Sequence, residues 1–413
     1  MHEPFKQSPV AKCTRRALFG GAIAGAVVMT PGCSFVNRFG EIPEGKLAES
    51  IHTSPNWIDG EFRNQQPTSV MVGKDGFVEA WWKFLTNSTP DLKPAAPLPC
   101  THTDLSALDP SRDIAVWLGH SGLYFQLAGL RFLVDPVYSA YASPVSFINK
   151  SFEFRSGYPF TAKTTPPIDL LILTHDHWDH LDCETIKALD HKVKRYAVPL
   201  GVNSHLLAWG INPDKILVFD WYDAARFTEP KPEVVHPFHK PEPAEWKSGA
   251  LQAPAIYFFP SRHFSGRTLK RDQTLWGSYV IEAGGKRLYL SGDGGNGPHF
   301  KEIGDLFRDS GGFDLAFIED GQYNADWAEI HMAPEGSVKA ATEVGAKSVI
   351  PIHNCRYALA RHAWYDPLER IRMASHLADW KLLTPKVGDV VPIGDLTIEF
   401  PAWWRDVPKS ASS

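Results

Sequence analysis

A dense group of histidine and aspartate follows a short apolar segment near the middle of the chain. The segment Leu170–Thr174 has the composition of a buried strand, and it is followed at once by the sequence HDHWDH. His175 and His177 are two residues apart, so in an extended chain their imidazoles project to the same side. Asp179 and His180 follow as the chain turns. Imidazole nitrogens and carboxylate oxygens suit zinc and similar divalent ions, so this segment predicts a metal site.

Three more candidate ligands stand in comparable places along the chain. His263, Asp293 and His353 each come three or four residues after an aliphatic segment. Ligand sites favour the carboxyl ends of strands, where a rigid backbone delivers side chains to an accessible edge. We therefore expect all three to meet the HDHWDH segment in space.

Seven donors are too many for one tetrahedral ion, and they suit two ions about 3.5–4 Å apart. We assign three histidines to the first ion (His175, His177 and His263), three residues to the second (Asp179, His180 and His353), and Asp293 as the bridge. A carboxylate shared by two cations offsets their mutual repulsion. Each ion would keep an open position, and a water bound there would lose a proton near neutral pH and act as the nucleophile.

These side chains must be positioned by a domain that begins near Asp113. From there on, short β-branched or aliphatic runs bounded by turn residues predict strands. The predicted strands are Ile114–Leu118, Gly122–Leu127, Leu130–Val134, Leu170–Thr174, Arg195–Val198, Ile216–Phe219, Ile256–Phe259, Ser278–Ile281, Leu288–Leu290, Leu315–Ile318 and Ser348–Ile350. The predicted helices are Glu184–Leu189, Val202–Trp209, His299–Phe307, Pro334–Val344 and Pro367–Leu377. This alternation indicates a layered α/β or α+β domain.

The chain before this domain divides into two parts. Residues 1–33 carry Arg15 and Arg16 ahead of an apolar run, Ala17–Met29, that is too short to cross a bilayer and fits a secretory signal. The paired arginines resemble a twin-arginine export signal, and the small residues before Cys33 resemble a lipoprotein cleavage site. Residues 34–110, rich in Pro, Asn and Asp with an amphipathic stretch at Phe77–Leu85, are expected to wrap the catalytic domain, residues 111–413.

Composition narrows the function classes. The 413 residues are 43% hydrophobic and 22% charged, which is ordinary globular usage and argues against wholesale disorder or a multi-span membrane protein. The net charge is −5, and it is more negative without the basic first 33 residues. An acidic body argues against nucleic acid as the partner. We expect a small-molecule or lipid substrate, and an exported protein that is periplasmic or membrane-anchored through a lipidated Cys33 in a bacterial envelope.

The ligand pattern resembles the metallo-β-lactamase superfamily. The motif His175-x-His177-x-Asp179-His180, with the later His263, Asp293 and His353, matches that family's motifs in order. The resemblance implies a four-layer αββα sandwich of the α+β class, with two divalent metal ions, zinc in the first instance, at one edge. It is closest to the group of N-acylphosphatidylethanolamine-hydrolysing phospholipase D and its bacterial relatives. The strings that carry this are Trp117-Leu-Gly-His120, Asp135-Pro136, Val198-Pro-Leu-Gly201, His263-Phe-Ser-Gly-Arg267-Thr268, Leu275-Trp276-Gly277-Ser278 and His331-Met-Ala-Pro334-Glu335.

The resemblance implies a phosphodiesterase acting on N-acyl phospholipid-like substrates. A hydroxide bridging the metals would attack phosphorus, and the metals would stabilise the added negative charge. Asp179 and His331 would act in catalysis, His331 by binding phosphate or by passing a proton to the leaving group. Asp182 would orient a ligating imidazole from behind.

Some residues around the motifs depart from the phospholipase pattern. Asn354 and Cys355 follow His353, and Glu319 and Asp320 stand where apolar and small residues are usual. Because such changes alter the pocket lining, the same metal site hydrolysing a lactone, an amide or an ester stays an alternative. A two-iron oxidoreductase is disfavoured because those relatives usually carry Glu at the position of His177. An envelope lipoprotein with a vestigial metal site is the non-enzyme alternative.

Overall fold

The structure is a computed structural model, and it describes residues 35–72, 89–228, 232–236 and 254–410. The predicted export signal with Cys33 and the predicted amphipathic stretch Phe77–Leu85 lie outside the described residues. Among the described residues, no helix has the length and apolar character that crossing a membrane requires.

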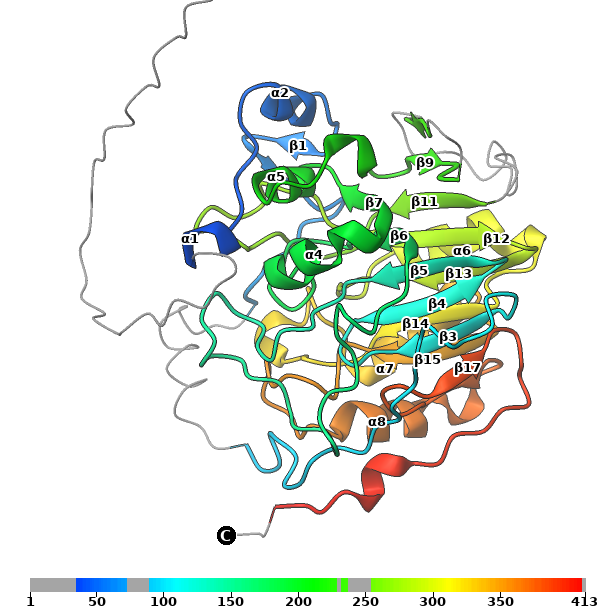
Figure 1. The fold of residues 1–413 in the computed structure, drawn as a ribbon. Helices are drawn as coiled ribbons and strands as arrows, with labels where there is room; N and C mark the ends of the chain where they lie inside the picture. The colour runs from blue at the N-terminus through cyan, green and yellow to red at the C-terminus, as the bar shows by residue number, and fades with distance from the viewer. Residues whose placement is uncertain (1–34, 73–88, 229–231, 237–253, 411–413) are drawn as a thin grey trace, which may run out of the picture.

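Two mixed sheets stack face to face, with helices on the outside, to form the α+β sandwich of four layers (Figure 1). The first sheet has the strand order β17 (Val390–Pro392), β3 (Ile114–Trp117), β4 (Leu123–Leu127), β5 (Leu130–Val134), β6 (Ile168–Ile172), β7 (Val193–Pro199) and β8 (Ile216–Phe219). The second has the order β10 (Val234–Val235), β9 (Ala224–Ala225), β11 (Ala255–Phe259), β12 (Ser278–Ala283), β13 (Lys286–Leu290), β14 (Leu315–Glu319), β15 (Ser348–Ile352) and β16 (Lys381–Leu382).

The helices cover the two outer faces. The first sheet is covered by α4 (Cys183–Leu189) and α5 (Val202–Ala208). The second is covered by α6 (His299–Phe307), α7 (Pro334–Val344) and α8 (Asp366–Ala374). Because helices cover one face of each sheet and the partner sheet covers the other, central strands such as β4 and β14 are buried along their whole length. Aromatic rings join the sheets: Phe125 stacks 4.5 Å from Phe132 and lies 6.4 Å from Phe317 of the opposite sheet.

The predicted strands and helices all form, with ends shifted by a few residues. Two of these shifts concern the site, and the first is at β6, which ends at Ile172 instead of Thr174. At β15 the strand continues through Pro351 to Ile352, so His353 follows it directly. The short strands β9, β10, β16 and β17 were not predicted, because two or three residues are too few to show a period.

The chain before the sandwich runs along its surface toward the edge that carries the histidines. It contains α1 (Phe35–Arg38), α2 (Lys46–His52) and the two-residue strands β1 (Trp57–Ile58) and β2 (Glu61–Phe62). The amide of Phe62 donates to the carbonyl of Asp272 at 2.8 Å, and the side-chain amide of Asn56 donates to Asp220 at 2.7 Å. This segment is therefore hydrogen-bonded to core loops at several points.

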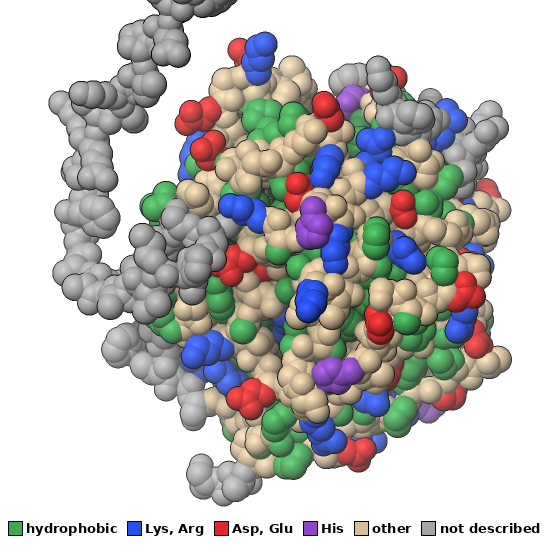
Figure 2. All heavy atoms as spheres, in the orientation of Figure 1, with side chains coloured by type: hydrophobic (Ala, Val, Ile, Leu, Met, Phe, Trp, Pro, Cys, Tyr) green, Lys and Arg blue, Asp and Glu red, His purple; other side chains and the backbone are tan. Residues whose placement is uncertain are grey.

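Charged side chains of both signs are interspersed on the surface. On the described part of the face in Figure 2, lysine and arginine lie scattered among aspartate, glutamate and many uncharged side chains.

Candidate metal centre

The seven predicted donors meet at one edge of the sandwich. The HDHWDH segment leaves the end of β6 in the first sheet, and His263, Asp293 and His353 leave β11, β13 and β15 in the second. All of them are buried except His177, which is half-buried. Both sheets thus contribute donors to a single centre.

The three histidines assigned to the first ion form one group. The donor atoms that His175, His177 and His263 offer lie within 4.8 Å of one another. Nε2 of His263 lies 3.1 Å from Nδ1 of His177, and Nε2 of His175 is buried without a hydrogen-bond partner. A buried, unpartnered imidazole nitrogen beside two others is what an ion would satisfy.

The residues assigned to the second ion form a neighbouring group. Oδ2 of Asp179 lies 3.2 Å from Nε2 of His353 and 3.6 Å from Nε2 of His180. Oδ2 of Asp293 lies 3.1 Å from Nε2 of His180 and 3.0 Å from Nε2 of His353.

Asp293 stands between the two groups, as the bridge assignment expects. The same Oδ2 is 3.9 Å from Nε2 of His175 in the first group, and Oδ1 of Asp293 is buried without a hydrogen-bond partner. A buried carboxylate oxygen with no donor is costly unless a cation completes it. The donor types and their convergence therefore fit a pair of divalent ions.

A carboxylate behind the site sets the ring orientation of two of these histidines. Oδ2 of Asp135 accepts a hydrogen bond from Nδ1 of His180 at 2.8 Å and one from Oγ1 of Thr174 at 2.6 Å. Thr174 Oγ1 in turn accepts from Nδ1 of His175 at 3.0 Å. With the proton on Nδ1 in both rings, the lone pair of each Nε2 points to the site, which is the form that binds metal.

The remaining rings are held by backbone and by a second buried carboxylate. Nδ1 of His263 donates to the carbonyl of Ile330 at 3.0 Å. Nδ1 of His353 faces the carbonyl of Gly321 and Oε1 of Glu319, both at 3.4 Å. These contacts hold Nδ1 of both rings, so Nε2 of His263 and of His353 faces the other donors, where a cation could bind.

The pKa shifts of the predicted ligands reflect their burial and the charges of their neighbours. Burial drives the pKa of His175 and His263 well below the usual histidine value, so both rings are neutral as ligands must be. Burial alone would raise the pKa of Asp293, but His180 and His353 outweigh it and hold that pKa well below its ordinary range. Burial would likewise lower the pKa of His180, but Asp293, Asp179 and Asp135 raise it to about 10. Without an ion, the proton on His180 therefore balances the negative charge of the neighbouring carboxylates, and metal binding must displace this proton.

A cavity of about 250 Å³ opens over this centre. Its walls include six apolar side chains: Val70, Met71, Phe264, Trp327, Ile330 and Leu359. None of the described residues that line it is lysine or arginine. His331 also lines it, with its ring stacked 5.2 Å from that of His353 and its Nδ1 in contact with Oε1 of Glu319. The structure thus places His331 beside the donor set, in the wall of this cavity.

The prediction for Asp182 is wrong. Its carboxylate caps α4 by accepting from the amide of Glu184, and it also accepts from the hydroxyls of Ser139 and Thr185. Asp182 directly precedes the helix, so it serves the amides there instead of the ligating rings. One carboxylate that does contact such a ring is Asp135, which stands one residue after β5, the same signal that marks the ligands.

Sequence reasoning also gave no role to three other residues at the centre. Glu319, the last residue of β14, is fully buried and accepts from the amide of Gly294 at 2.6 Å. The side chain of Asn64, from the N-terminal segment, donates to the carbonyl of His263 at 2.7 Å and accepts from its amide at 3.1 Å. His120 contacts Asp179 at 2.8 Å. None of these follows from spacing, because each contact joins segments far apart in the sequence.

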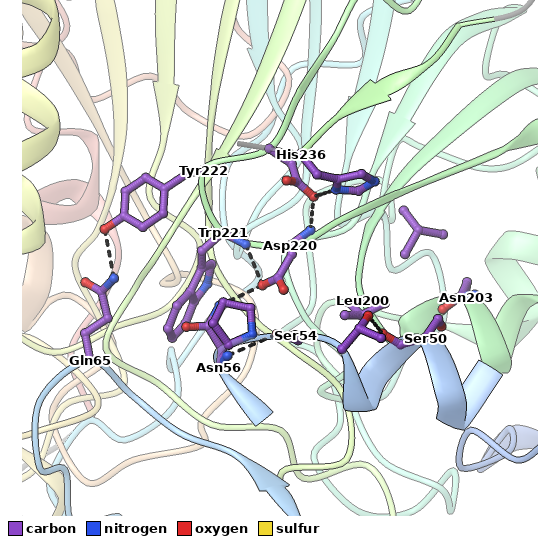
Figure 3. Close-up of a pocket in the computed structure, with 14 residues that line it drawn as sticks. Ser50, Ser54, Asn56, Gln65, Leu200, Asn203, Asp220, Trp221, Tyr222 and His236 are labelled. Atoms are coloured by element: carbon purple, nitrogen blue, oxygen red, sulfur yellow. Dashed lines mark hydrogen bonds and ion pairs between the residues drawn. The ribbon is translucent and has the colours of Figure 1, made fainter. Parts of the chain in front are cut away.

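A larger cavity, of about 520 Å³, lies elsewhere and shares no lining residue with the first (Figure 3). It lies between the N-terminal segment and the loop after β8, and several of the polar side chains drawn in it are hydrogen-bonded to one another. Oδ1 of Asp220 accepts from Asn56 and from the amide of Trp221, and Gln65 donates to the hydroxyl of Tyr222. The unpartnered ligand atoms of His175 and Asp293 belong to the centre under the smaller cavity, so size alone does not mark the candidate metal centre.

Comparison with known proteins gives an independent view of this architecture. Residues 130–354 match the model of the β-lactamase superfamily domain. An uncharacterized protein of Mycobacterium tuberculosis is 32% identical over 358 residues, covering 85% of this chain and 88% of that protein. The N-acyl-phosphatidylethanolamine-hydrolyzing phospholipase D 1 of Caenorhabditis elegans is 27% identical over 296 residues, covering 68% and 76%. The outer membrane protein RomA of Klebsiella pneumoniae is 50% identical over 98 residues, covering 24% and 72%.

Proposed function

The chain belongs to the β-lactamase superfamily and is a metal-dependent hydrolase, and from this premise we propose that it is a two-metal phosphodiesterase of the phospholipase D type. The observation that carries the proposal is the pair of donor groups with Asp293 between them. Two adjacent cations suit in-line displacement at phosphorus, because one can stabilise the attacking oxygen and the other the leaving oxygen. When bound, the ions would supply an activated water and neutralise charge on the phosphoryl oxygens.

We assign zinc to both positions because imidazole and carboxylate donors suit it. The seven ligands are those named from the sequence, with Asp179 completing the second position. His331 serves the substrate: with Nδ1 held by Glu319, Nε2 is the ring atom left to contact phosphate or to hand a proton to the leaving group.

The cavity lining supports a substrate of low charge with an apolar part. Because no described lining residue is lysine or arginine, the ions alone would balance the single negative charge of a phosphodiester. Val70, Met71 and Leu359 offer apolar contact to an acyl group beside the cleaved bond. An N-acyl phospholipid has both features, and the relative from Caenorhabditis elegans is named for hydrolysing one.

A panel of substrates tests this proposal. The purified protein, loaded with zinc, is offered an N-acyl phospholipid, bis(p-nitrophenyl) phosphate, a lactone and a β-lactam, each with and without a chelator. We expect cleavage of the two phosphodiesters, abolished by the chelator. Cleavage of the lactone alone would move the function to the second candidate below. No cleavage at all would favour an envelope lipoprotein with a vestigial site.

The second candidate is the same centre acting on a lactone, an amide or a carboxylic ester. Glu319 favours it, since a fully buried carboxylate 3.4 Å from Nδ1 of His353 adds negative charge beside the ions. The negative charge of Glu319 weakens the attraction of the centre for an anionic phosphodiester, but it does not weaken the binding of a neutral ester.

We also propose an exported location for the protein, with residues 1–33 as the signal, Cys33 as the lipidated residue and residues 34–110 as an extension of the catalytic domain 111–413. The partial match to an outer membrane protein supports an envelope site. Fractionation of cells that express the wild type and a Cys33→Ser variant tests this. An intact N-terminus found in the cytoplasm would contradict export, and palmitate labelling that survives Cys33→Ser would contradict the lipidation site.

A further inference from the structure

We propose that His120 is a positioning residue that holds Asp179 and His353 in place to bind the second ion. This inference rests on the two-ion centre of the proposed function. It concerns the ion's affinity and not which bond is cleaved.

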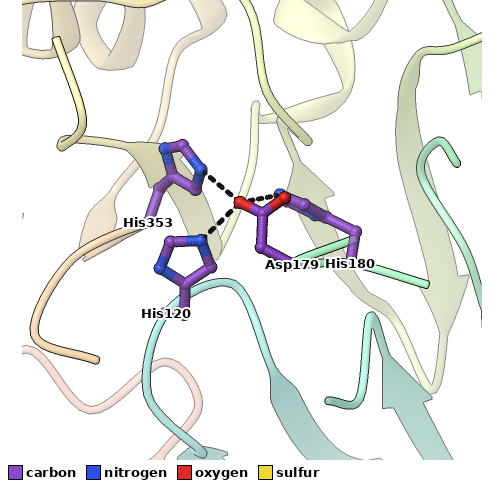
Figure 4. Close-up of side chains that lie close together, drawn as sticks. All are labelled: His120, Asp179, His180 and His353. Atoms are coloured by element: carbon purple, nitrogen blue, oxygen red, sulfur yellow. Dashed lines mark hydrogen bonds and ion pairs between the residues drawn. The ribbon is translucent and has the colours of Figure 1, made fainter. Parts of the chain in front are cut away.

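The side chain of His120 reaches Asp179 directly. In Figure 4 the rings of His120, His180 and His353 surround the carboxylate of Asp179, with dashed contacts from all three. The contact from Nε2 of His120 to Oδ2 of Asp179 is the shortest, at 2.8 Å, against 3.2 Å for His353. His120 is buried, so water does not compete for this bond.

The backbone of His120 holds the other ligand. Its amide donates to the carbonyl of Asn354 at 3.0 Å, and its carbonyl accepts from the amide of His353 at 3.0 Å. The same carbonyl accepts from Nε1 of Trp117 at 2.8 Å. His120 has a positive φ of 55°, which is uncommon outside glycine and persists only where such contacts over-determine it. One residue thus joins the turn after β3, in the first sheet, to the end of β15, in the second.

The tautomer separates a positioning role from direct ligation. Nδ1 of His120 is buried and has no hydrogen-bond partner. If Nε2 bound the ion, its neutral ring would carry the proton on Nδ1 and leave a buried N–H donor unpaired, which is rare in proteins. If Nε2 carries the proton and donates to Asp179, only an acceptor stays unpaired, and that costs less. The geometry therefore favours donation.

Two variants test the proposal in the full chain. His120→Gln can keep an N–H donor near the position of Nε2, whereas His120→Leu fills similar space without one. Both are unbranched at Cβ, so the positive φ strains them alike. His299→Leu, at another buried histidine outside the centre, is the matched control for placing leucine in the core.

The measurement is the affinity of each zinc ion, from competition with a chromophoric chelator. We expect His120→Leu to lose about 10- to 100-fold in affinity for one ion and to keep the other, while His120→Gln and His299→Leu stay within about threefold of the wild type. Equal affinities in the wild type and His120→Leu would overturn the inference.

A second measurement, made on the wild type, tests the proposal even if the His120→Leu variant does not fold. Nitrogen-detected imidazole spectra of the zinc-loaded wild type should show the proton of His120 on Nε2. A metal-bound Nε2 would make His120 a ligand and overturn the positioning role. A wild type that takes up one ion would overturn the two-ion proposal and this inference together, whereas two ions held equally by all variants would overturn this inference alone.

Discussion

Asp293 lies beside both donor groups and is the residue that we propose as the bridge between them. Its Oδ2 lies within 3.1 Å of His180 and His353 and 3.9 Å from His175. Asp293→Asn keeps the shape and removes the charge. We expect turnover of the cleaved panel substrate to fall by at least about 100-fold, because the bridge no longer balances two cations. Circular dichroism should show the fold retained, and a rate equal to that of the wild type would mean that the centre lies elsewhere.

Asp135 and Asp182 form a matched pair for testing which carboxylate supports the ligands. Asp135→Asn can no longer accept from both His180 and Thr174 as a carboxylate does, so we expect zinc affinity to fall by about 10- to 100-fold. Asp182→Asn keeps a side chain that can cap α4, so its zinc affinity should stay within about twofold of the wild type. Equal losses in the two variants, measured by chelator competition, would contradict the assignment.

At the scale of elements, the loop that connects β8 in the first sheet to β9 in the second contains a buried aspartate, Asp223. Asp223 lies between β8 and β9; its carbonyl accepts from the amide of Phe258 in β11 at 2.9 Å, and its Oδ2 lies 2.6 Å from Nδ1 of His236. Burial raises the pKa of Asp223 from 3.8 to about 7, although the amide of Asp220 and the ring of His236 oppose the rise.

This shift predicts how stability depends on pH. The folded protein binds the proton on Asp223 more tightly than the unfolded chain does, so the resulting stability is complete below about pH 4 and is lost as the pH rises through about 7. Asp223→Asn mimics the protonated acid and removes this dependence. Between about pH 5 and about pH 8, we expect the Tm of the wild type to fall by a few degrees relative to that of the variant. Parallel Tm curves for the two proteins would contradict the prediction.

The elements also show what sequence patterns can and cannot reveal. Helices α6 and α7 begin and end where predicted, because each has an amphipathic period, and α7 also has Pro334 in its first turn. The meeting of the seven donors could be predicted because each follows a strand end. The bond from Thr174 to Asp135 could not, since it depends on β5 and β6 lying side by side with Val134 opposite Ile172. Such pairing across the sheet leaves no signal in local spacing.

At the scale of the whole molecule, the centre ties the two sheets together. Its donors come from β6 on one side and from β11, β13 and β15 on the other, so bound ions would cross-link the sandwich. Ligands that bind only the folded state stabilise it, by about 2.7 kcal/mol at a hundred times their Kd. We expect chelation to lower the Tm by several degrees and added zinc to restore it. A Tm that chelator and zinc leave unchanged would contradict the centre as a cross-link.

The hydrogen bonds between Asn64 and His263 have a consequence for how this enzyme can be divided or transplanted. Asn64, Val70 and Met71 all precede the sandwich. Asn64 is hydrogen-bonded to the backbone of the predicted ligand His263, and Val70 and Met71 line the cavity over the centre. A fragment with only the two sheets and their helices would keep the seven donors but lose the part of the cavity wall that Val70 and Met71 form. We therefore expect that exchanging the N-terminal segment between relatives changes substrate preference while every donor stays in place.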